Sequence, residues 1–450
     1  MRARKKLVVL LTIIAMISVL ALSSCAPKAD TGGSTGGGTS GGDAPATEVD
    51  QSKETIVFGG ARSQSGVFAI FDQTVFGPIY RMWVDKVNAD GGLFVKEYDK
   101  KMPIELIIYD DKSDIATMSR LYEKLMVEDK VDFLIPPVST AALYALAPLA
   151  EKHGYLLLGA EGGADSLKEQ IEACPNFFSV LNIAGNQVPV LLDIFKEVGA
   201  KTMYVAYIED LHGTEYFAMI EELIEGTEYE IVGSSKIPLD MTDFTSVINS
   251  AKASGADAFI TPCYPDQNIP LVNAAVAMDY NPNLYISGPG VTYDFFQYAI
   301  GAAGSPQENI EGMMGFGAWN EKSGDGAKAF REQFVAAFGP EGDNTLNNPD
   351  AGDKEINQDW WGHLQYQVVV DVLEQAIVGA GTLDNHTVAQ YIKDNKFETS
   401  MGEVYFVDNF VAPECYVGNI GQWQSGIFEV VDPGANRTAD PIYPKPAWPK

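Results

Sequence analysis

Beyond residue 54 the chain alternates between short apolar runs and longer stretches in which apolar residues recur every three or four positions. The short runs have the continuity of strands buried on both faces, and the longer stretches have the period of amphipathic helices. This alternation predicts a parallel sheet covered by helices on both faces. The expected strands span residues 55–60, 104–109, 131–135 and 155–158, and the expected helices span residues 75–88, 115–128 and 140–153.

The same rhythm starts again near residue 200, which predicts a second lobe built like the first. Phe244, Val247, Ile248 and Ala251 show the helical period, because positions i, i+3, i+4 and i+7 share one helix face. Strands are expected over residues 202–207, 230–232, 258–261 and 284–287, and helices over 215–224, 244–253 and 269–278. In the less regular last third, helices are expected over residues 326–338, 360–378 and 388–394, and strands over 403–407 and 427–431.

Two α/β lobes fit a chain of 450 residues, which is too long for one compact domain. We expect the chain to pass between the lobes three times, near residues 181–184, near residues 314–318 and around Glu403. These passages form a multi-strand hinge. The expected division assigns residues 55–181 and 317–403 to the first lobe, and residues 182–316 and 404–450 to the second lobe and a C-terminal tail.

The first 24 residues have the features of a secretory signal. Four basic residues precede an apolar run over residues 7–22, which is shorter than the ~20 residues that a membrane-spanning helix needs. The following Leu22-Ser23-Ser24-Cys25 resembles the bacterial lipobox, which predicts cleavage before Cys25 and a lipid anchor on this residue. The alternatives are an ordinary signal with an incidental cysteine, or an anchor that stays uncleaved. Residues 25–54 then form a tether rich in Gly, Ser and Thr.

The charge balance excludes two classes of partner. The chain carries 61 acidic and 31 basic residues, for a formal net charge of −30, and loss of the basic signal sequence makes it −34. Binding to a phosphate backbone or to anionic lipid needs clustered Lys and Arg, so nucleic acid is not an expected partner. We expect the acidity to serve solubility.

Three further cysteines, Cys174, Cys263 and Cys415, remain in the mature chain. They lie far apart in the sequence and lack the spacing of metal ligands. In an oxidising compartment two alternatives stay open for them. Either Cys263 and Cys415 form a disulfide, or the thiols are free and buried.

No catalytic or cofactor motif fits the sequence. The four histidines lie outside any HExxH pattern, and there is no GxSxG elbow and no recognisable cysteine nucleophile. Gly288-Pro289-Gly290 follows a strand but lacks the third glycine of a dinucleotide-binding loop. Asp110-Asp111 fits a turn and a helix cap better than an acid–base pair. We therefore expect no enzyme, no metal and no cofactor.

Polar, aromatic and glycine residues follow five of the expected strands. In open α/β sheets ligands bind at this edge, because the helix N-termini present free N–H groups there. Each loop alone is also explained as a turn or a helix cap, but five loops from two lobes fit one shared crevice. They are Ser139-Thr140, Glu161-Gly162-Gly163, Asp210-Leu211-His212-Gly213, Cys263-Tyr264-Pro265-Asp266 and Gly288-Pro289-Gly290-Val291.

The order and spacing of these segments resemble the type I periplasmic binding proteins, in particular the branch that binds leucine, isoleucine and valine. The resemblance runs from about Thr55 to Val431. It implies two doubly wound α/β lobes that close on a ligand about a hinge. The ordered series carries the resemblance, and no single motif in it is highly specific. Further matching segments are residues 87–92 (VNADGG), 107–111 (IIYDD) and 243–254, and Met401-Gly402 before a strand.

The resemblance also implies the residues of a ligand site. The Thr140 hydroxyl and nearby backbone N–H groups would hold a ligand carboxylate. Tyr264 would close over the ligand from the second lobe, and His212 would stack on it or donate a hydrogen bond. The structural alternatives are a surface-loop position for His212 and a core-edge position for Tyr264. The complete expected site is Ser139, Thr140, Glu161, Gly163, His212 and Tyr264.

Two departures from the family pattern bear on the ligand. A second hydroxyl that relatives use for the carboxylate is replaced by Gly163, and the acid that pairs with a ligand ammonium falls near Pro289. Glu161 and Asp266 are the available substitutes. Because a buried ammonium without a partner is costly, amides, urea-like compounds and aromatic or aliphatic carboxylates stand beside α-amino acids as candidate ligands. The candidates for an aromatic wall are Phe68, Tyr144, Tyr264, Tyr293 and the Trp360-Trp361 pair.

The function that this resemblance implies is that of an extracytoplasmic solute-binding lipoprotein of an ABC importer. We expect a monomer, anchored to the membrane through Cys25, that delivers a small-molecule solute to permease subunits powered by a cytoplasmic ATPase. A receptor of the same fold that signals to a membrane partner is the first alternative, and an enzyme is the second.

Overall fold

The computed structural model describes residues 50–288, 310–338 and 362–448, which belong to one compact unit spanning residues 49–450. Among these described residues, no helix combines the length and the apolar character that crossing a membrane requires. Several expected features lie outside the described residues: the signal sequence, Cys25 and most of the tether, Pro289 to Val291, Tyr293, and the Trp360-Trp361 pair.

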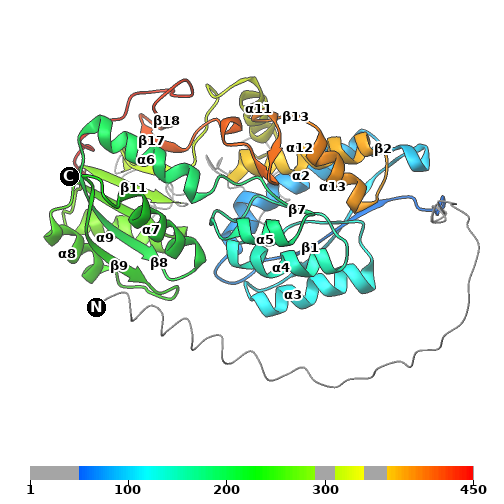
Figure 1. The fold of residues 1–450 in the computed structure, drawn as a ribbon, viewed down its shortest axis with the longest axis horizontal. Helices are drawn as coiled ribbons and strands as arrows, with labels where there is room; N and C mark the ends of the chain where they lie inside the picture. Colours follow the sequence, from blue (N-terminus) through cyan, green and yellow to red (C-terminus); the bar gives the residue numbers. More distant parts are fainter. Residues whose placement is uncertain (1–49, 289–309, 339–361, 449–450) are drawn as a thin grey trace, which may run out of the picture. The chain divides into compact units, whose positions relative to one another are not determined.

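The first lobe holds two groups of hydrogen-bonded strands (Figure 1). Their members are β1 (Ile56–Arg62), β4 (Ile104–Asp110) and β5 (Phe133–Leu134) in one group, and β6 (Leu157–Gly159), β7 (Phe177–Ser179), β15 (Phe406–Val407) and β16 (Phe410–Val411) in the other. β1 pairs in parallel with β4 and β5, and β7 pairs in parallel with β6 and β16. The parallel pairing agrees with the alternation of strands and helices in the sequence.

Helices cover the first-lobe strands on both faces. They are α2 (Gly77–Ala89), α3 (Ile115–Lys124), α4 (Thr140–Lys152), α5 (Leu167–Ala173), α11 (Asp325–Phe338), α12 (Gly362–Ala380) and α13 (Asn385–Asp394). The π-helical segment η1 (Phe71–Phe76) precedes α2, and a second such segment, η3 (Leu125–Asp129), extends α3. Two hairpins complete the lobe: β2 (Leu93–Val95) with β3 (Lys100–Met102), and β13 (Phe397–Thr399) with β14 (Gly402–Val404).

Residues of β1 show why its apolar run predicted a fully buried strand. Phe58 packs edge-to-face on Trp83 of α2, with ring centroids 5.2 Å apart, in the core that α2 and α12 share. Ala61 belongs to a second cluster, together with Tyr122 of α3 and Leu143 of α4. Both faces of the strand are therefore covered, and neither carries the alternating polar positions of a half-exposed strand.

The second lobe is built on one seven-stranded sheet in the order β18-β17-β12-β11-β10-β8-β9. Its strands are β8 (Thr202–Ile208), β9 (Glu230–Ile237), β10 (Ala258–Pro262), β11 (Leu284–Gly288), β12 (Met314–Phe316), β17 (Ile420–Gln424) and β18 (Ile427–Val430). Its helices are α6 (Ala184–Val198), α7 (Leu211–Ile224), α8 (Thr245–Ser254) and α9 (Pro265–Ala277). The strands from β8 to β12 pair in parallel, whereas β17 and β18 are antiparallel.

The side chains of β8 divide between the two faces of this sheet. Met203 and Val205 belong to a core cluster with α6 and α7, whereas Tyr204 and Ala206 belong to the cluster that contains α8 and α9. Figure 1 shows these helices as layers around the green strands of the lobe. The predicted fold class, two doubly wound α/β lobes, agrees with this arrangement.

The chain passes between the two sets of strands three times: from β7 to α6, from β12 to α11, and from η6 (Pro413–Cys415) to β17. The first two passages lie where the sequence predicted them. The third lies at residues 416–419 instead of around Glu403, because β15 and β16 first pair back onto β7. Residues 406–411 therefore extend the first-lobe strands, and the remaining domain boundaries stay a prediction.

Helix α6 was missing from the expected elements, although Val188, Leu191 and Phe195 have a helical period. Pro189 lies inside this helix, and a proline within an apolar stretch argues against a helix interior. It lies within the first six residues of α6, so most of the hydrogen bonds of the helix are unaffected. Strands β7, β12 and β17 were also missed, because each has only three to five residues.

Cys174, Cys263 and Cys415 are free and buried. The expected disulfide between Cys263 and Cys415 is therefore wrong, and the alternative of buried thiols is right. Burial raises the pKa of each of these thiols, so they are unreactive at neutral pH.

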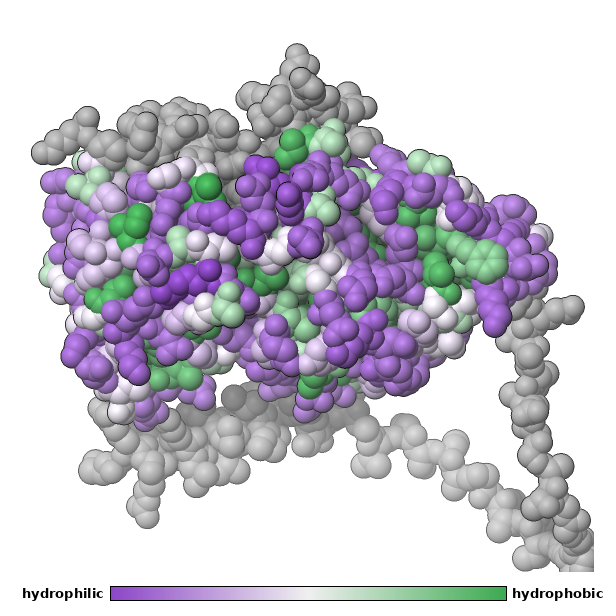
Figure 2. Space-filling model, turned by 90° about the horizontal axis from the view of Figure 1, so that it is seen from above, coloured by the Kyte–Doolittle hydropathy of each residue, from purple (hydrophilic) through white to green (hydrophobic). Residues whose placement is uncertain are grey.

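Figure 2 shows the hydropathy of one face of the described residues. The face in Figure 2 is mostly hydrophilic, and its apolar residues form small scattered groups. Such scattered apolar residues are normal for a soluble domain and mark no extended docking face.

Candidate functional site

Eleven residues from both lobes line one cavity, which contains about 350 Å³ of space free of protein atoms. All six residues of the expected site line the cavity: Ser139, Thr140, Glu161, Gly163, His212 and Tyr264. Its other lining residues are Phe68, Phe71, Phe76, Val138 and Leu181.

Three helices begin at the cavity. α4 begins at Thr140, α7 begins one residue before His212, and Tyr264 is the residue that precedes the first turn of α9. A helix start carries unpaired N–H groups and a partial positive charge, so three starts at one cavity favour an anionic group there.

The sequence placed the starts of α7 and α9 too late, at residues 215 and 269. Asp210 caps α7, because its side chain accepts a hydrogen bond of 3.0 Å from the Gly213 N–H. Pro265 occupies the first turn of α9, where a proline is tolerated because its missing N–H would have no partner. His212 therefore lies in the first turn of α7, and Tyr264 directly precedes α9.

Ser139 holds an uncommon backbone conformation at the start of α4. Its φ of 93° and ψ of 152° lie in a region that side-chain-bearing residues rarely adopt, at a cost of about 1–3 kcal/mol. Its hydroxyl accepts a hydrogen bond of 3.3 Å from the Ala142 N–H and so caps the helix. Strain of this kind gathers at binding sites, and here it fixes the direction of α4 toward the cavity.

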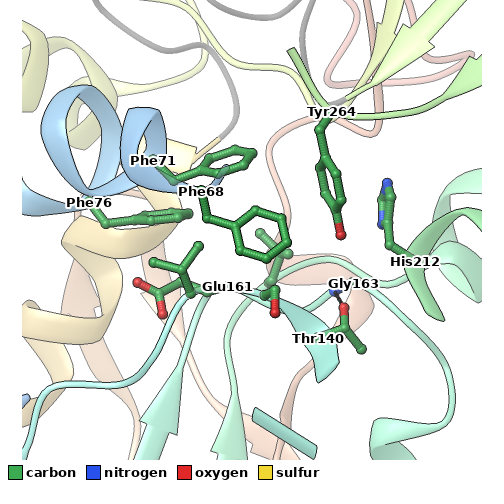
Figure 3. Close-up of a pocket in the computed structure, with 11 residues that line it drawn as sticks. Phe68, Phe71, Phe76, Thr140, Glu161, Gly163, His212 and Tyr264 are labelled. Carbon is green, nitrogen blue, oxygen red and sulfur yellow. Dashed lines mark hydrogen bonds between the residues drawn. The ribbon is translucent and has the colours of Figure 1, made fainter. Parts of the chain in front are cut away.

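The Thr140 hydroxyl is poised to donate a hydrogen bond. Its oxygen accepts a bond of 3.2 Å from the Gly163 N–H, which leaves the hydroxyl proton without a prescribed acceptor (Figure 3). Gly163 itself has room for a side chain, since an added Cβ would lie 3.5 Å from the Leu181 side chain. The glycine therefore marks a missing hydroxyl and not a steric requirement of the fold.

His212 and Tyr264 stack on each other, with ring centroids 5.4 Å apart and an interplanar angle of 19°. The Tyr264 hydroxyl donates a hydrogen bond of 2.5 Å to Asp210 Oδ2, which fixes the ring. Burial lowers the pKa of His212, although Asp210 and a backbone hydrogen bond at Gly288 oppose this, and its Nε2 has no hydrogen-bond partner in the part of the chain that the structure describes. A neutral imidazole therefore presents a free nitrogen.

Phe68 and Phe71 of the first lobe meet Tyr264 of the second. Both contacts are edge-to-face, with centroid distances of 5.5 Å to Phe68 and 5.8 Å to Phe71. Phe71 also stacks on Phe76 at 6.0 Å and 18°. Of the aromatic wall predicted from the sequence, Phe68 and Tyr264 line the cavity and Tyr144 does not.

A buried ion pair lies at the Phe76 side of the cavity. Arg62 Nη1 donates to Glu161 Oε1 at 2.5 Å, and Arg62 Nε donates to Asp72 Oδ1 at 2.7 Å. Burial raises the pKa of Glu161 to about 8, although the neighbouring guanidinium opposes this rise. Asp266, the other acid considered for a ligand ammonium, is exposed and does not line the cavity.

Arg62 was missed at the level of sequence. It ends the apolar strand IVFGGAR, where a buried cation is unusual, and this was the available signal. Its partners lie 10 and 99 residues away in the sequence, so spacing alone does not predict the pair. Among the described residues, no group of three or more His, Cys, Asp or Glu residues is arranged to hold a metal ion.

A family model described as periplasmic binding protein matches residues 55–424. The chain belongs to the periplasmic binding protein family. This membership confirms the resemblance to the type I proteins that the sequence indicated.

Three solved structures show the same fold at low sequence identity. A branched-chain amino acid transporter substrate binding protein from Streptococcus pneumoniae, in complex with isoleucine, has a TM-score of 0.67 and 18% identity over 84% of this chain and 98% of that chain. A solute binding protein of an ABC transporter from Rhodopseudomonas palustris, in complex with 3,4-dihydroxybenzoic acid, has a TM-score of 0.67 and 17% identity over 84% and 95% of the two chains. Another from this organism, in complex with benzoate, has a TM-score of 0.68 and 16% identity over 85% and 96%.

Proposed function

We propose that this protein is the extracytoplasmic receptor of an ABC importer and holds a small carboxylate-bearing solute in the cavity between its lobes. The observation that carries the proposal is the meeting of three helix starts with the Thr140 hydroxyl at one cavity. These groups stabilise an anion without a buried cation of their own.

The charges around the cavity agree with this assignment. Glu161 is the one acidic residue among the described residues that line it, and Arg62 is already paired with the carboxyl groups of Glu161 and Asp72. A ligand carboxylate would therefore receive hydrogen bonds from neutral donors and helix-start amides and not a direct countercharge. Isoleucine, benzoate and 3,4-dihydroxybenzoic acid, the compounds bound by the structural neighbours, all carry a carboxylate.

Hinge closure is the proposed mechanism of binding. Phe68 and Phe71 of the first lobe and Tyr264 of the second all line the cavity, so a solute in the cavity touches both lobes at once. Such contacts exist only in the closed arrangement, and the solute shifts the population toward it by this difference in affinity. The closed lobes would then dock on permease subunits powered by a cytoplasmic ATPase.

The remaining parts of the proposal concern the location of the protein. We propose that Cys25 is lipidated after removal of the signal sequence, and that residues 25–54 tether a monomeric receptor to the outer face of the membrane. Exchange of Cys25 for alanine should release the protein from the membrane fraction, which immunoblotting of cell fractions checks.

The first experiment identifies the solute. The chain without its first 24 residues and with Cys25→Ala is purified under native conditions, and mass spectrometry of the released small molecules should recover a carboxylate-bearing compound. Calorimetry with that compound should then show binding that Tyr264→Ala weakens at least tenfold. Recovery of only neutral or cationic solutes contradicts the ligand class, and full affinity in the Tyr264→Ala variant contradicts the position of the site.

A further inference from the structure

Two polar atoms of the Arg62–Glu161 pair have no hydrogen-bond partner among the described residues. Glu161 Oε2 and Arg62 Nη2 are buried without a hydrogen bond, although the other atoms of both groups are engaged. Glu161 lines the cavity, and its side chain is fully buried. An unpaired buried carboxylate oxygen is costly, so this oxygen at a cavity wall points to a ligand group that pairs with it.

Charge balance makes Glu161 receptive to a hydrogen-bonding partner. One guanidinium serves two buried carboxylates, Asp72 and Glu161, so the cluster carries either an excess negative charge or a proton. Burial raises the pKa of Glu161 to about 8, so both protonation states are accessible near neutral pH. A hydroxyl group accepts from the protonated acid and donates to the ionised one, whereas an ammonium only donates.

The surroundings of Glu161 suit a flat apolar body. Figure 3 shows Glu161 on the Phe76 side of the cavity, whereas Thr140, His212 and Tyr264 lie on the opposite side. Phe68, Phe71 and Phe76 line the space between, so a ligand that reaches from Thr140 to Glu161 passes along aromatic rings. Ring-to-ring packing of this kind favours a planar aromatic ligand.

We propose that Glu161 is the specificity-determining residue for a hydroxyaryl carboxylate, whose carboxylate lies at Thr140 and whose ring hydroxyl pairs with Glu161 Oε2. This assignment rests on the proposed function and narrows its ligand class. An α-amino acid fits less well, because its ammonium lies one carbon from its carboxylate and would stay near Thr140. Arg62 acts through Glu161, because its bond to Oε1 leaves Oε2 as the oxygen that can pair with the ligand.

Calorimetry on the Cys25→Ala chain tests the assignment with matched ligands. 4-Hydroxybenzoate should bind at least tenfold more tightly than 4-methylbenzoate, which has the same shape but leaves Glu161 Oε2 unpaired. Leucine should bind more weakly than either. Equal affinity for the hydroxyl and methyl compounds overturns the assignment even if no variant folds.

Glu161→Met provides the second arm of the test, because it removes both oxygens and leaves Arg62 in a balanced pair with Asp72. This variant should bind 4-hydroxybenzoate and 4-methylbenzoate equally. Glu169→Met, on the exposed surface of α5, is the matched control and should keep the preference. Retention of the full preference in Glu161→Met overturns the role of Glu161.

The outcomes also separate this inference from the proposed function. Tight binding of leucine without binding of either aromatic acid overturns the hydroxyaryl assignment and leaves the carboxylate receptor in place. Failure of all three probes to bind, with no carboxylate compound released from the purified protein, overturns the proposed function itself.

Discussion

Thr140 combines two tasks in one hydroxyl group. Its oxygen accepts from the Gly163 N–H and thereby holds the loop after β6, and its proton stays available for the solute. The sequence predicted this residue because Ser139-Thr140 follows an apolar strand and opens a helical pattern. That prediction used only local information, whereas Arg62 and Glu161 lie 99 residues apart, so no local pattern predicts their pairing.

Thr140→Ala should lower the affinity for the carboxylate solute by about 10- to 150-fold, since hydrogen bonds to charged groups contribute ~1.5–3 kcal/mol. Thr140→Ser retains the hydroxyl and should stay within about threefold of the wild type. Calorimetry measures both, and thermal unfolding verifies that both variants fold. Equal loss in the two variants would show that the methyl group and not the hydroxyl matters.

Gly163→Ser should supply the second hydroxyl that the family pattern places here. The Cβ would meet only ordinary contacts, such as Tyr216 Oη at 3.9 Å, so the free energy of unfolding should change by less than about 1 kcal/mol. Affinity for the carboxylate should rise about three- to tenfold. At the neighbouring Gly162 a Cβ would lie 2.8 Å from Leu167, so Gly162→Ser should destabilise the protein. Equal destabilisation by both substitutions contradicts this view of Gly163.

The raised pKa of Glu161 predicts a pH dependence of stability. The folded protein keeps the Glu161 proton up to about pH 8, whereas the unfolded chain releases it near pH 4.3. This contribution is fully present below about pH 4.3 and is lost as the pH rises through 8, with a limiting slope of about 1.4 kcal/mol per pH unit. Urea unfolding at pH 5, 6.5 and 8 should therefore show the wild type losing stability relative to Glu161→Gln. Parallel pH profiles of the two proteins contradict the prediction.

The first and third passages between the lobes are joined by a network of buried and half-buried amides and a carboxylate. Asn182 Nδ2 donates to Asn419 Oδ1 at 2.6 Å, and Asn419 Nδ2 donates to Asp432 Oδ2 at 2.7 Å. The Asn182 N–H also donates to Gln365 Oε1 at 2.9 Å, which connects the first passage to α12. These bonds link two hinge segments that lie 237 residues apart.

Asn182→Ala should remove the side-chain bonds to Asn419 Oδ1 and from Asn186 Nδ2, whereas the backbone bond to Gln365 stays. We expect the free energy of unfolding to fall by about 1–3 kcal/mol. We also expect the ligand to reduce the radius of gyration, measured by small-angle X-ray scattering, by less than it does in the wild type. Gln390→Ala removes an exposed amide from α13 and should change neither quantity. A normal closing response in Asn182→Ala contradicts the role of the network in the hinge.

At the level of elements, the long strands could be predicted from their continuous apolar runs, because both faces of each strand are covered. The long helices could be predicted from the helical period of their apolar residues. The short strands β7 and β16 do not, because their residues are set by pairing partners more than 200 positions apart. The third passage was misplaced for the same reason. Sequence periodicity reports burial along one segment, whereas pairing between distant short segments depends on the assembled lobe.

At the scale of the whole molecule, both lobes line the proposed solute cavity. The first lobe supplies Thr140, Glu161 and the phenylalanine rings, and the second supplies His212 and Tyr264. In the proposed function the strongly negative surface takes no direct part, because the anion would be held at helix starts within the cavity. Of the five loops that the sequence singled out, four contribute residues to the cavity wall, and the fifth lies mostly outside the described residues.

The central claim is that the cavity recognises a carboxylate, and calorimetry with acid and amide pairs tests it most directly. Benzoate and benzamide, and leucine and leucinamide, differ at the group expected at Thr140 while the rest of each molecule is unchanged. In whichever pair binds, the acid should bind at least tenfold more tightly than its amide, because helix-start amides and the Thr140 hydroxyl favour the anion. Equal or tighter binding of the amide would contradict the account.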